Sequence, residues 1–164
     1  MDMIIRFLAD GLMVLIALLA GYSLLFRVHR KNVYDTYARI FMAGISSYWI
    51  AKMVATLWQP AALRPFELMG SEAGASYLNN PGFPSDHALF ATFLTLAVWY
   101  ATRNRTLVGI MATLTVLVCV GRVLALVHTP LDIAGGVIVA GIGALWYIDG
   151  IPKFRRRLVK KSRK

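Results

Sequence analysis

Five long apolar segments dominate this chain of 164 residues and restrict what it can fold into. A helix of about 20 apolar residues is long enough to cross the ~30 Å hydrocarbon core of a bilayer. Hydrophobic residues make up 58% of the chain and charged residues only 16%, whereas a soluble domain carries about a quarter charged residues. The sequence therefore predicts an all-α integral membrane helical bundle of about five transmembrane helices. Their expected ranges are Met3–Phe26, Ile40–Trp58, Ala88–Thr102, Leu107–Val127 and Leu131–Ile148.

These segments predict one transmembrane domain over residues 1–152, followed by a basic tail over residues 153–164. The first segment does not resemble a cleaved signal peptide, because its apolar core is too long and no small-residue cleavage site follows it. This first segment is also the one that could lie outside the core of the bundle. No internal repeat is found, and there is no room for a second domain.

Basic residues predict how the spans are oriented. The net charge is +10, and most of the basic residues fall in residues 27–39, in residues 103–105 and in the tail, which carries eight of them. Five spans place all three regions on one side, and the positive-inside rule makes that side cytoplasmic. We therefore expect a multi-pass cell-membrane protein with its N-terminus outside and its C-terminus in the cytoplasm. A basic run can also bind nucleic acid, but beside apolar spans we expect the bilayer as its partner and no nucleic acid.

The only long loop is predicted over residues 59–87, on the outer side. It contains a possible short interfacial helix at Ala62–Met69 and a run of turn-forming residues at 79–82. The single cysteine, Cys119, lies within an apolar run and offers neither a disulfide framework nor a cysteine metal site. We expect it to behave as a small buried hydrophobic residue.

Polar side chains gather at the predicted outer ends of the spans. Charged groups near a membrane interior are costly and need partners, so they indicate a functional site. Several have a simpler explanation: Ser85 as a helix cap, Asp132 in a capping box with Thr129, Arg122 as a side chain reaching the headgroups, and a lone histidine at the interface as a structural residue. If all of these held, the chain would be a purely structural membrane protein. The convergent set is Arg64, Ser85, His87, Arg122, His128 and Asp132, with Lys52 deeper in the membrane.

Phosphoryl transfer is the chemistry that this set of residues suits. Two arginines can grip phosphate oxygens through paired hydrogen bonds, and a helix that begins at Ser85 offers free backbone N–H groups to an anion. One histidine can attack phosphorus while the other protonates the leaving oxygen. Asp132, four residues after His128, can accept the second imidazole N–H and fix its tautomer. This chemistry needs no metal and no cofactor, and the spacing matches no zinc signature.

Three short motifs resemble those of the type 2 phosphatidic acid phosphatase superfamily, and most closely its undecaprenyl-diphosphate phosphatase branch. They are Arg64-Pro65, Pro84-Ser85-Asp86-His87 and Arg122-x5-His128-x3-Asp132. The resemblance implies a helical membrane phosphatase in which His128 is the nucleophile, His87 the general acid and Asp132 the group that orients His128. It further implies that Arg64, Ser85 and Arg122 bind the phosphate.

The chain departs from the family pattern at several positions. Leu57 stands where the family has a lysine, and Lys52 is the nearest residue that could take over a phosphate-binding role. Asp86 replaces the usual glycine of the second motif, as it often does in the undecaprenyl-diphosphate phosphatase branch, and we include it as a candidate phosphate-site residue. Gly121 stands where a serine often precedes the arginine, so one hydroxyl is missing. The family commonly has six spans, one more than the segments counted here.

The function expected from these residues is hydrolysis of a phosphate or diphosphate monoester of a lipid carrier, releasing inorganic phosphate. Undecaprenyl diphosphate is the favoured substrate, and the site is expected on the extracytoplasmic face. Alternatives are a phosphatidylglycerophosphate or phosphatidic acid phosphatase and a prenyl-phosphosugar phosphatase, because the motifs recognise the phosphate and not the lipid tail. A non-catalytic lipid-phosphate binding or transport protein is the alternative from a different class. The oligomeric state does not follow from the sequence.

Overall fold

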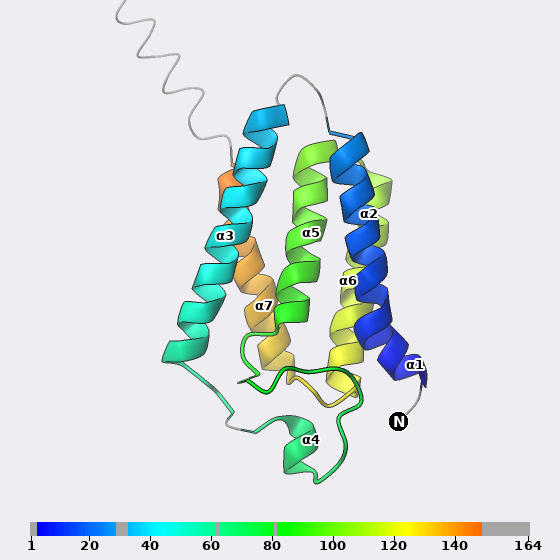
Figure 1. Cartoon of the computed structure of the whole chain (residues 1–164), viewed down its shortest axis with the longest axis vertical. Helices are drawn as coiled ribbons and strands as arrows, with labels where there is room; N and C mark the ends of the chain where they lie inside the picture. The colour runs from blue at the N-terminus through cyan, green and yellow to red at the C-terminus, as the bar shows by residue number, and fades with distance from the viewer. Residues whose placement is uncertain (1–2, 29–32, 62, 81, 149–164) are drawn as a thin grey trace, which may run out of the picture.

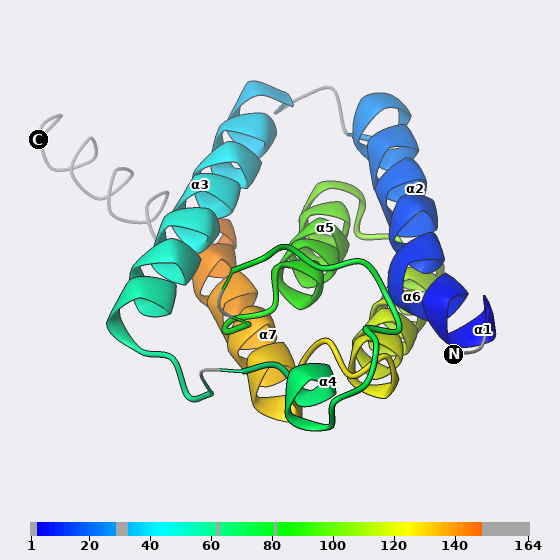
Figure 2. The same cartoon turned by 60° about the horizontal axis from the view of Figure 1, so that its bottom comes forward.

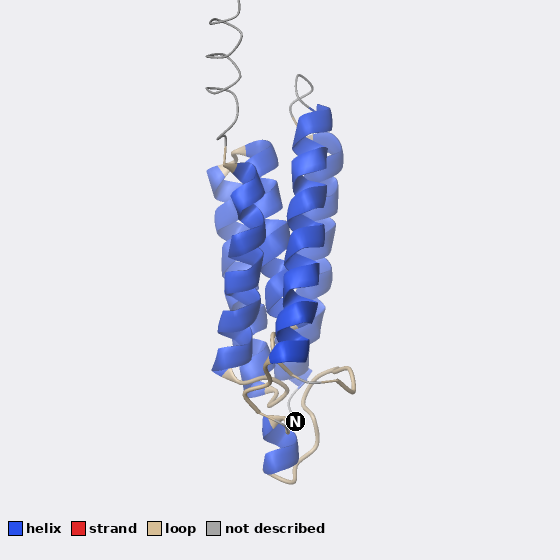
Figure 3. Ribbon diagram, turned by 90° about the vertical axis from the view of Figure 1, so that its left-hand side faces the viewer, coloured by secondary structure: helices blue, strands red, loops and turns tan. Residues whose placement is uncertain are grey.

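Every regular element in the part of the chain that the structure describes is a helix (Figure 3). The structure is a computed structural model, and it describes residues 3–28, 33–61, 63–80 and 82–148. The prediction of an all-α membrane bundle is confirmed, while the predicted basic tail lies outside the described residues. The elements are α1 (Met3–Arg6), the π-helical turn η1 (Phe7–Gly11), α2 (Leu12–Phe26), α3 (Val33–Leu57), α4 (Pro65–Leu68), α5 (Asp86–Thr102), α6 (Arg105–Leu124), α7 (Pro130–Gly143) and the 3-10 helix η3 (Ala144–Tyr147).

Four helical stretches are long and apolar enough to cross a membrane, judged by length and composition. The remaining predicted span, Ala88–Thr102, forms α5, which has 17 residues and is therefore ~26 Å long. This helix lies in the middle of the bundle and packs against α2, α3, α6 and α7 (Figures 1 and 2). Because its neighbours cover much of its surface, α5 needs less lipid-facing apolar area than they do. The four stretches are Met3–Phe26, Val33–Leu57, Arg105–Leu124 and Pro130–Tyr147.

The first apolar segment is part of the core and does not lie outside it. Leu12, Ile16 and Ala20 of α2 are buried in one cluster with side chains of α5 and α6, among them Val98 and Met111. Between α5 and α6, the hydroxyl oxygens of Thr95 and Thr115 lie 3.0 Å apart and share a hydrogen bond. Apolar packing and one buried polar pair thus hold α2, α5 and α6 together, as is usual in membrane bundles.

Two helix boundaries differ from the predicted ranges for local reasons. Helix α3 begins at Val33 and so includes a polar turn before the predicted start; there Asp35 accepts a 3.0 Å hydrogen bond from Arg39, one helical turn later. Such pairs, with an acid in the first turn, stabilise a helix start. Helix α6 ends at Leu124, because Leu126 adopts a φ of 58°, which a right-handed helix does not contain.

The chain connections divide between the two ends of the bundle. The end of α2, the start of α3 and the α5–α6 connection lie at one end, at the top of Figure 1. The long loop that carries α4 lies at the other end together with the α6–α7 connection, and Figure 2 shows it crossing over the end of the bundle. The predicted interfacial helix at Ala62–Met69 is shortened to α4, which begins with Pro65 at its first position, where proline is favoured.

Candidate active site

The structure brings the predicted outer-end residues together at the loop end of the bundle. Arg64 directly precedes α4, Ser85 caps α5, and Asp86 and His87 lie in the first turn of α5. Arg122 lies in the last turn of α6, and Asp132 lies in the first turn of α7. His128 lies in the connection between these two helices. The starts of α4, α5 and α7, the end of α6 and the α6–α7 connection therefore meet at one place.

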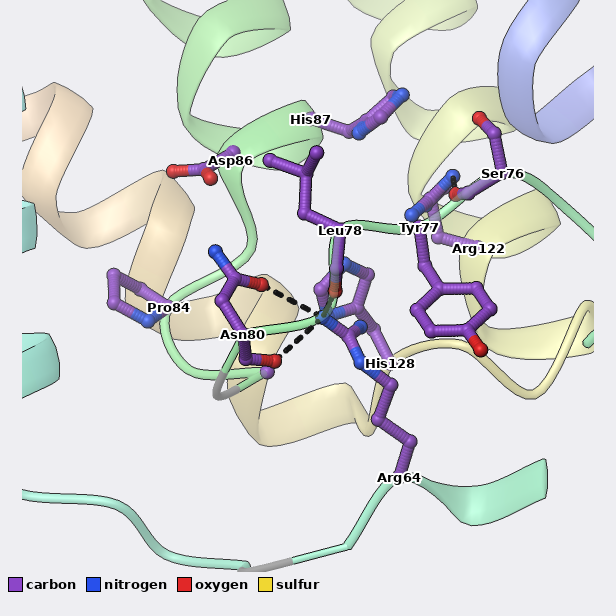
Figure 4. Close-up of a pocket in the computed structure, with 11 residues that line it drawn as sticks. Arg64, Ser76, Tyr77, Leu78, Asn80, Pro84, Asp86, His87, Arg122 and His128 are labelled. Atoms are coloured by element: carbon purple, nitrogen blue, oxygen red, sulfur yellow. Dashed lines mark hydrogen bonds between the residues drawn. The ribbon is translucent and has the colours of Figure 1, made fainter. Parts of the chain in front are cut away.

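Under the long loop, five of these residues line a cavity of about 320 Å³, whereas Ser85 and Asp132 are not among its lining residues. In Figure 4, Arg64 and His128 lie below it, His87 lies at the start of α5, and Arg122 lies on the side opposite Pro84. Two histidines and two arginines thus share one cavity. Its lining residues are Arg64, Ser76, Tyr77, Leu78, Asn80, Gly82, Pro84, Asp86, His87, Arg122 and His128.

The start of α5 is held tightly against α7. The fully buried Ser85 accepts a 3.4 Å hydrogen bond from the Ala88 N–H, and its own N–H donates to the Asp132 carbonyl at 2.9 Å. A Cβ atom at Gly136 would lie 2.9 Å from the Leu89 nitrogen, so only glycine allows this close approach. Ser85 therefore acts as the expected N-cap, and the helix N-terminus that it caps opens toward the cavity.

The start of α7 positions Asp132 beside His128. The predicted capping box is present: the Thr129 N–H donates to Asp132 Oδ2 at 2.7 Å, and the Asp132 N–H donates to Thr129 Oγ1 at 3.2 Å. His128 Nδ1 lies 3.6 Å from the same carboxylate oxygen, which is longer than a hydrogen bond, and this buried nitrogen has no other partner. Nδ1 thus faces the carboxylate, which leaves Nε2 as the nitrogen available for chemistry.

Burial lowers the pKa of His128 below its ordinary value, and the positive charges of Arg122 and Arg64 lower this pKa further. Asp132 opposes both effects. A histidine has an ordinary pKa near 6.5, so the net direction keeps His128 neutral at neutral pH. A neutral imidazole has the lone pair that a nucleophile needs.

Arg64 is buried, and acceptors of the protein hold its guanidinium. Nη1 donates to the Val127 carbonyl at 2.6 Å, and Nη2 donates to the Leu78 and Asn80 carbonyls and to Asn80 Oδ1 at 3.1 Å each (Figure 4). Burial lowers the pKa of Arg64, but an arginine starts so high that it keeps its charge. Arg64 therefore both supports the loop and adds positive charge to the cavity.

Arg122 has a carboxylate partner that sequence reasoning missed. Its Nη1 donates to Asp10 Oδ1 at 2.8 Å and to the Ser76 carbonyl at 2.7 Å, whereas its buried Nε has no partner. His87 Nε2 lies 3.7 Å from the same Asp10 oxygen. A sequence signal was available, because a carboxylate inside an apolar span is costly and indicates a functional contact.

Lys52 and Asp86 form an ion pair beside the cavity. Lys52 Nζ lies 3.2 Å and 3.3 Å from the two Asp86 carboxylate oxygens. Asp86 lines the cavity, whereas Lys52 is not among the lining residues. Lys52 is therefore connected to the cavity only through its ion pair with Asp86. Within the described ranges, no group of three or more His, Cys, Asp or Glu side chains is placed to hold a metal ion.

Comparisons with known proteins agree with this architecture. A search of curated proteins and a search of solved structures each found no match. A family model described as the PAP2 superfamily matches residues 33–156, which is most of the chain. The match includes all the motif residues of the cavity and leaves out α1, η1 and α2. The chain therefore belongs to the PAP2 superfamily and is a multi-pass membrane protein among phosphatases of lipid-like phosphate esters.

Proposed function

We propose that this chain removes the terminal phosphate of a membrane lipid through a phosphohistidine at His128. The observation that carries the proposal is the cavity that His87, His128, Arg64 and Arg122 line together at one end of a membrane bundle. Undecaprenyl diphosphate, which would yield undecaprenyl phosphate and inorganic phosphate, is the first substrate to test. The Asp86 variant of the second motif supports this choice, because it resembles that branch of the family.

The reaction divides into two balanced steps. In the first, His128 Nε2 bonds to phosphorus, the bond from phosphorus to the lipid oxygen breaks, and protonated His87 gives that oxygen its proton. In the second, His87 takes a proton from water, and the oxygen of that water displaces the histidine to release inorganic phosphate. Asp132 holds the Nδ1 proton and stabilises the charge on His128 throughout. No step requires a metal or a cofactor, so chelators should leave turnover unchanged.

Phosphate binding would use donors that the protein itself does not occupy. Arg122 Nε is buried without a partner, and the N-terminus of α5 offers backbone N–H groups beside Ser85. Arg64 can add charge while its protein contacts hold it in place. The negative oxygens of the phosphoryl group would thus meet fixed donors, which favours the transition state over the substrate.

A second cavity supports a lipid as the substrate. It has a volume of about 340 Å³ and runs from His87 and Asp86 along apolar side chains. Its walls come from α2, α3 and α5, whose outer surfaces face the membrane in our interpretation. A lipid tail can lie there while its phosphate enters the cavity between the histidines. The apolar and aromatic lining residues are Met13, Tyr48, Leu89 and Phe90.

Phosphate release from purified lipid phosphates in detergent tests the enzyme against the binding-protein alternative. The panel should contain undecaprenyl diphosphate, phosphatidylglycerophosphate, phosphatidic acid and a prenyl-phosphosugar. We expect release from at least one of them and inhibition by orthovanadate, which mimics the five-coordinate transition state. Tight binding of a lipid phosphate with no release by the wild-type chain would show a binding protein instead.

The site is proposed to face away from the cytoplasm, because Arg27 after α2 and Arg103 and Arg105 around the α5–α6 connection lie at the opposite end of the bundle. Single cysteines test this in a Cys119→Ala background: Glu72→Cys in the long loop and Thr106→Cys at the start of α6, both at exposed positions. A membrane-impermeant thiol reagent should label position 72 in intact cells, and position 106 only after the cells are broken. The reverse pattern would place the site in the cytoplasm.

A further inference from the structure

Asp10 belongs to the first helical segment, outside the region that the family model matches, yet it contacts the site at three points. Oδ1 accepts a 2.8 Å hydrogen bond from Arg122 Nη1 and lies 3.7 Å from His87 Nε2. Oδ2 accepts a 2.9 Å hydrogen bond from the Ser76 N–H. In Figure 4 these three partners lie on the side of the cavity away from Pro84. One carboxylate therefore bridges α6, the first turn of α5 and the long loop.

The Asp10 carboxylate is positioned by an unusual local backbone structure. Residues Phe7–Gly11 form a π-helical turn, a feature that is rare inside helices and frequent at functional sites. The backbone of this turn packs directly on α6 at Gly121, where a Cβ atom would lie 2.7 Å from the Ala9 nitrogen and 3.0 Å from its Cα. Only a glycine allows such an approach. Because Gly121 precedes Arg122, the contact brings Asp10 to that guanidinium.

The charges around His87 show what the carboxylate does there. The pKa of His87 is lowered from its ordinary value to about 4, first by burial and then by Arg122 from α6 and His128 from the α6–α7 connection, which disfavour a positive imidazole further. Two carboxylates oppose them, Asp10 from η1 and Asp86 on the same helix as His87. Each carboxylate also has a cation of its own, Lys52 of α3 at 3.2 Å from Asp86 and Arg122 at 2.8 Å from Asp10. Asp10 is the carboxylate whose oxygen lies close to the His87 imidazole, 3.7 Å from Nε2.

We propose that Asp10 is a positioning residue for the general acid: it holds Arg122 and His87 in place and stabilises the protonated His87 imidazole. This inference rests on the proposed function, in which His87 gives a proton to the leaving lipid oxygen. In this role the proton moves only between His87 and the leaving oxygen or the attacking water. The cost of a carboxylate inside an apolar helix is thereby offset by Arg122, and by His87 when it is protonated.

Asp10→Asn tests the inference, because it keeps the size of the side chain and removes its charge. The full chain in detergent is assayed with phosphatidic acid as the lipid phosphate, because its leaving alkoxide oxygen needs a proton. We expect kcat to fall about tenfold or more with little change in KM. In a plot of kcat/KM against pH, activity falls at high pH as His87 loses its proton, and we call this fall the basic limb. The basic limb should move to lower pH by about one unit or more, as expected for the loss of an opposite charge within ~4–6 Å. Asp10→Glu, which restores the charge, should move the limb back toward the wild-type position.

A matched control is Asp35→Asn, which removes a carboxylate from an exposed ion pair at the start of α3. It should leave rate and pH profile unchanged. A second substrate separates positioning of the acid from a merely structural role. p-Nitrophenyl phosphate has a leaving group that departs without a proton, so Asp10→Asn should lose much less activity on it than on the lipid phosphate. Equal losses on both substrates, with an unmoved basic limb, would show that Asp10 is only structural.

The two proposals fail in different ways. A wild-type chain that hydrolyses none of these substrates removes the proposed function and this inference with it. An active wild type that His128→Ala inactivates, combined with an unchanged pH profile in Asp10→Asn, removes only the inference about Asp10. Melting temperatures of all variants, measured in the same detergent, identify any loss of activity that comes from unfolding.

Discussion

The two histidines of the site each face a carboxylate at nearly the same distance, but the two pairs are built differently. His128 Nδ1 lies 3.6 Å from Asp132, four residues later in the chain. His87 Nε2 lies 3.7 Å from Asp10, which belongs to another helix and lies outside the family match. The first pair follows from local spacing and a capping box, whereas the second exists only because η1 packs on α6. Two histidine–carboxylate pairs of similar geometry can therefore arise in different ways, one from residues close together in the sequence and one from the packing of distant segments.

The largest expected effect comes from breaking the local pair. Asp132→Asn should lower kcat by roughly 10²–10⁴, by analogy with the loss of the orienting carboxylate in a catalytic triad. The charge that stabilises His128 is lost, and the imidazole is no longer held in the tautomer that leaves Nε2 free. The rate of phosphate release at saturating substrate concentration measures this change in kcat. A rate within threefold of wild type would show that His128 does not depend on this carboxylate.

The pH profile sharpens the comparison, because each pair should control a different limb. Burial lowers the pKa of His128, so the neutral nucleophile persists until the pH falls below the ordinary histidine value of about 6.5. Below its pKa, His128 binds a proton and kcat/KM should fall about tenfold per pH unit. We expect this acid limb to stay in place in Asp10→Asn. An acid limb centred above about pH 7 would contradict the assignment of His128.

Separating η1 from α6 should break the distant pair and spare the local one. Gly121→Ala adds a Cβ that would lie 2.7 Å from the Ala9 backbone nitrogen, so η1 must shift and Asp10 must move with it. We expect kcat to fall several-fold to about tenfold, with the same movement of the basic limb as in Asp10→Asn.

A matched glycine on the same helix provides the control for that variant. A Cβ at Gly109 would meet nothing within 4 Å, so Gly109→Ala should leave activity and pH profile unchanged. If Gly109→Ala and Gly121→Ala behaved alike, a general effect on α6 would explain both, and the packing of η1 would not matter for catalysis.

The smallest expected effect concerns the cap that supports the local pair. Thr129→Ala removes the hydroxyl that accepts from the Asp132 N–H, and loss of an N-cap costs about 1 kcal/mol of stability. We expect a slightly lower melting temperature and a loss of activity of only a few-fold, because the Thr129 backbone N–H still holds the Asp132 carboxylate. A loss as large as that of Asp132→Asn would show that the hydroxyl itself takes part in the chemistry.

The sequence by itself determined what depends on local rules. Segment length and apolar content predict membrane helices, because a span must satisfy its backbone hydrogen bonds within itself. Capping patterns predict helix starts at Ser85 and Thr129, and both are present. The i, i+4 spacing brings Asp132 near His128 because their connection is short. The gathering of motif residues at one end follows from the alternating direction of the spans.

Only the tertiary structure decided which distant groups meet. The central position of α5, the protein acceptors around Arg64 and the contact of Asp10 with Arg122 and His87 all join residues far apart in the chain. No local pattern encodes them, because they depend on how closely helix surfaces approach. At Gly121 a missing side chain lets a backbone sit directly on α6, and its consequence for Asp10 becomes visible only when the two helices are packed together.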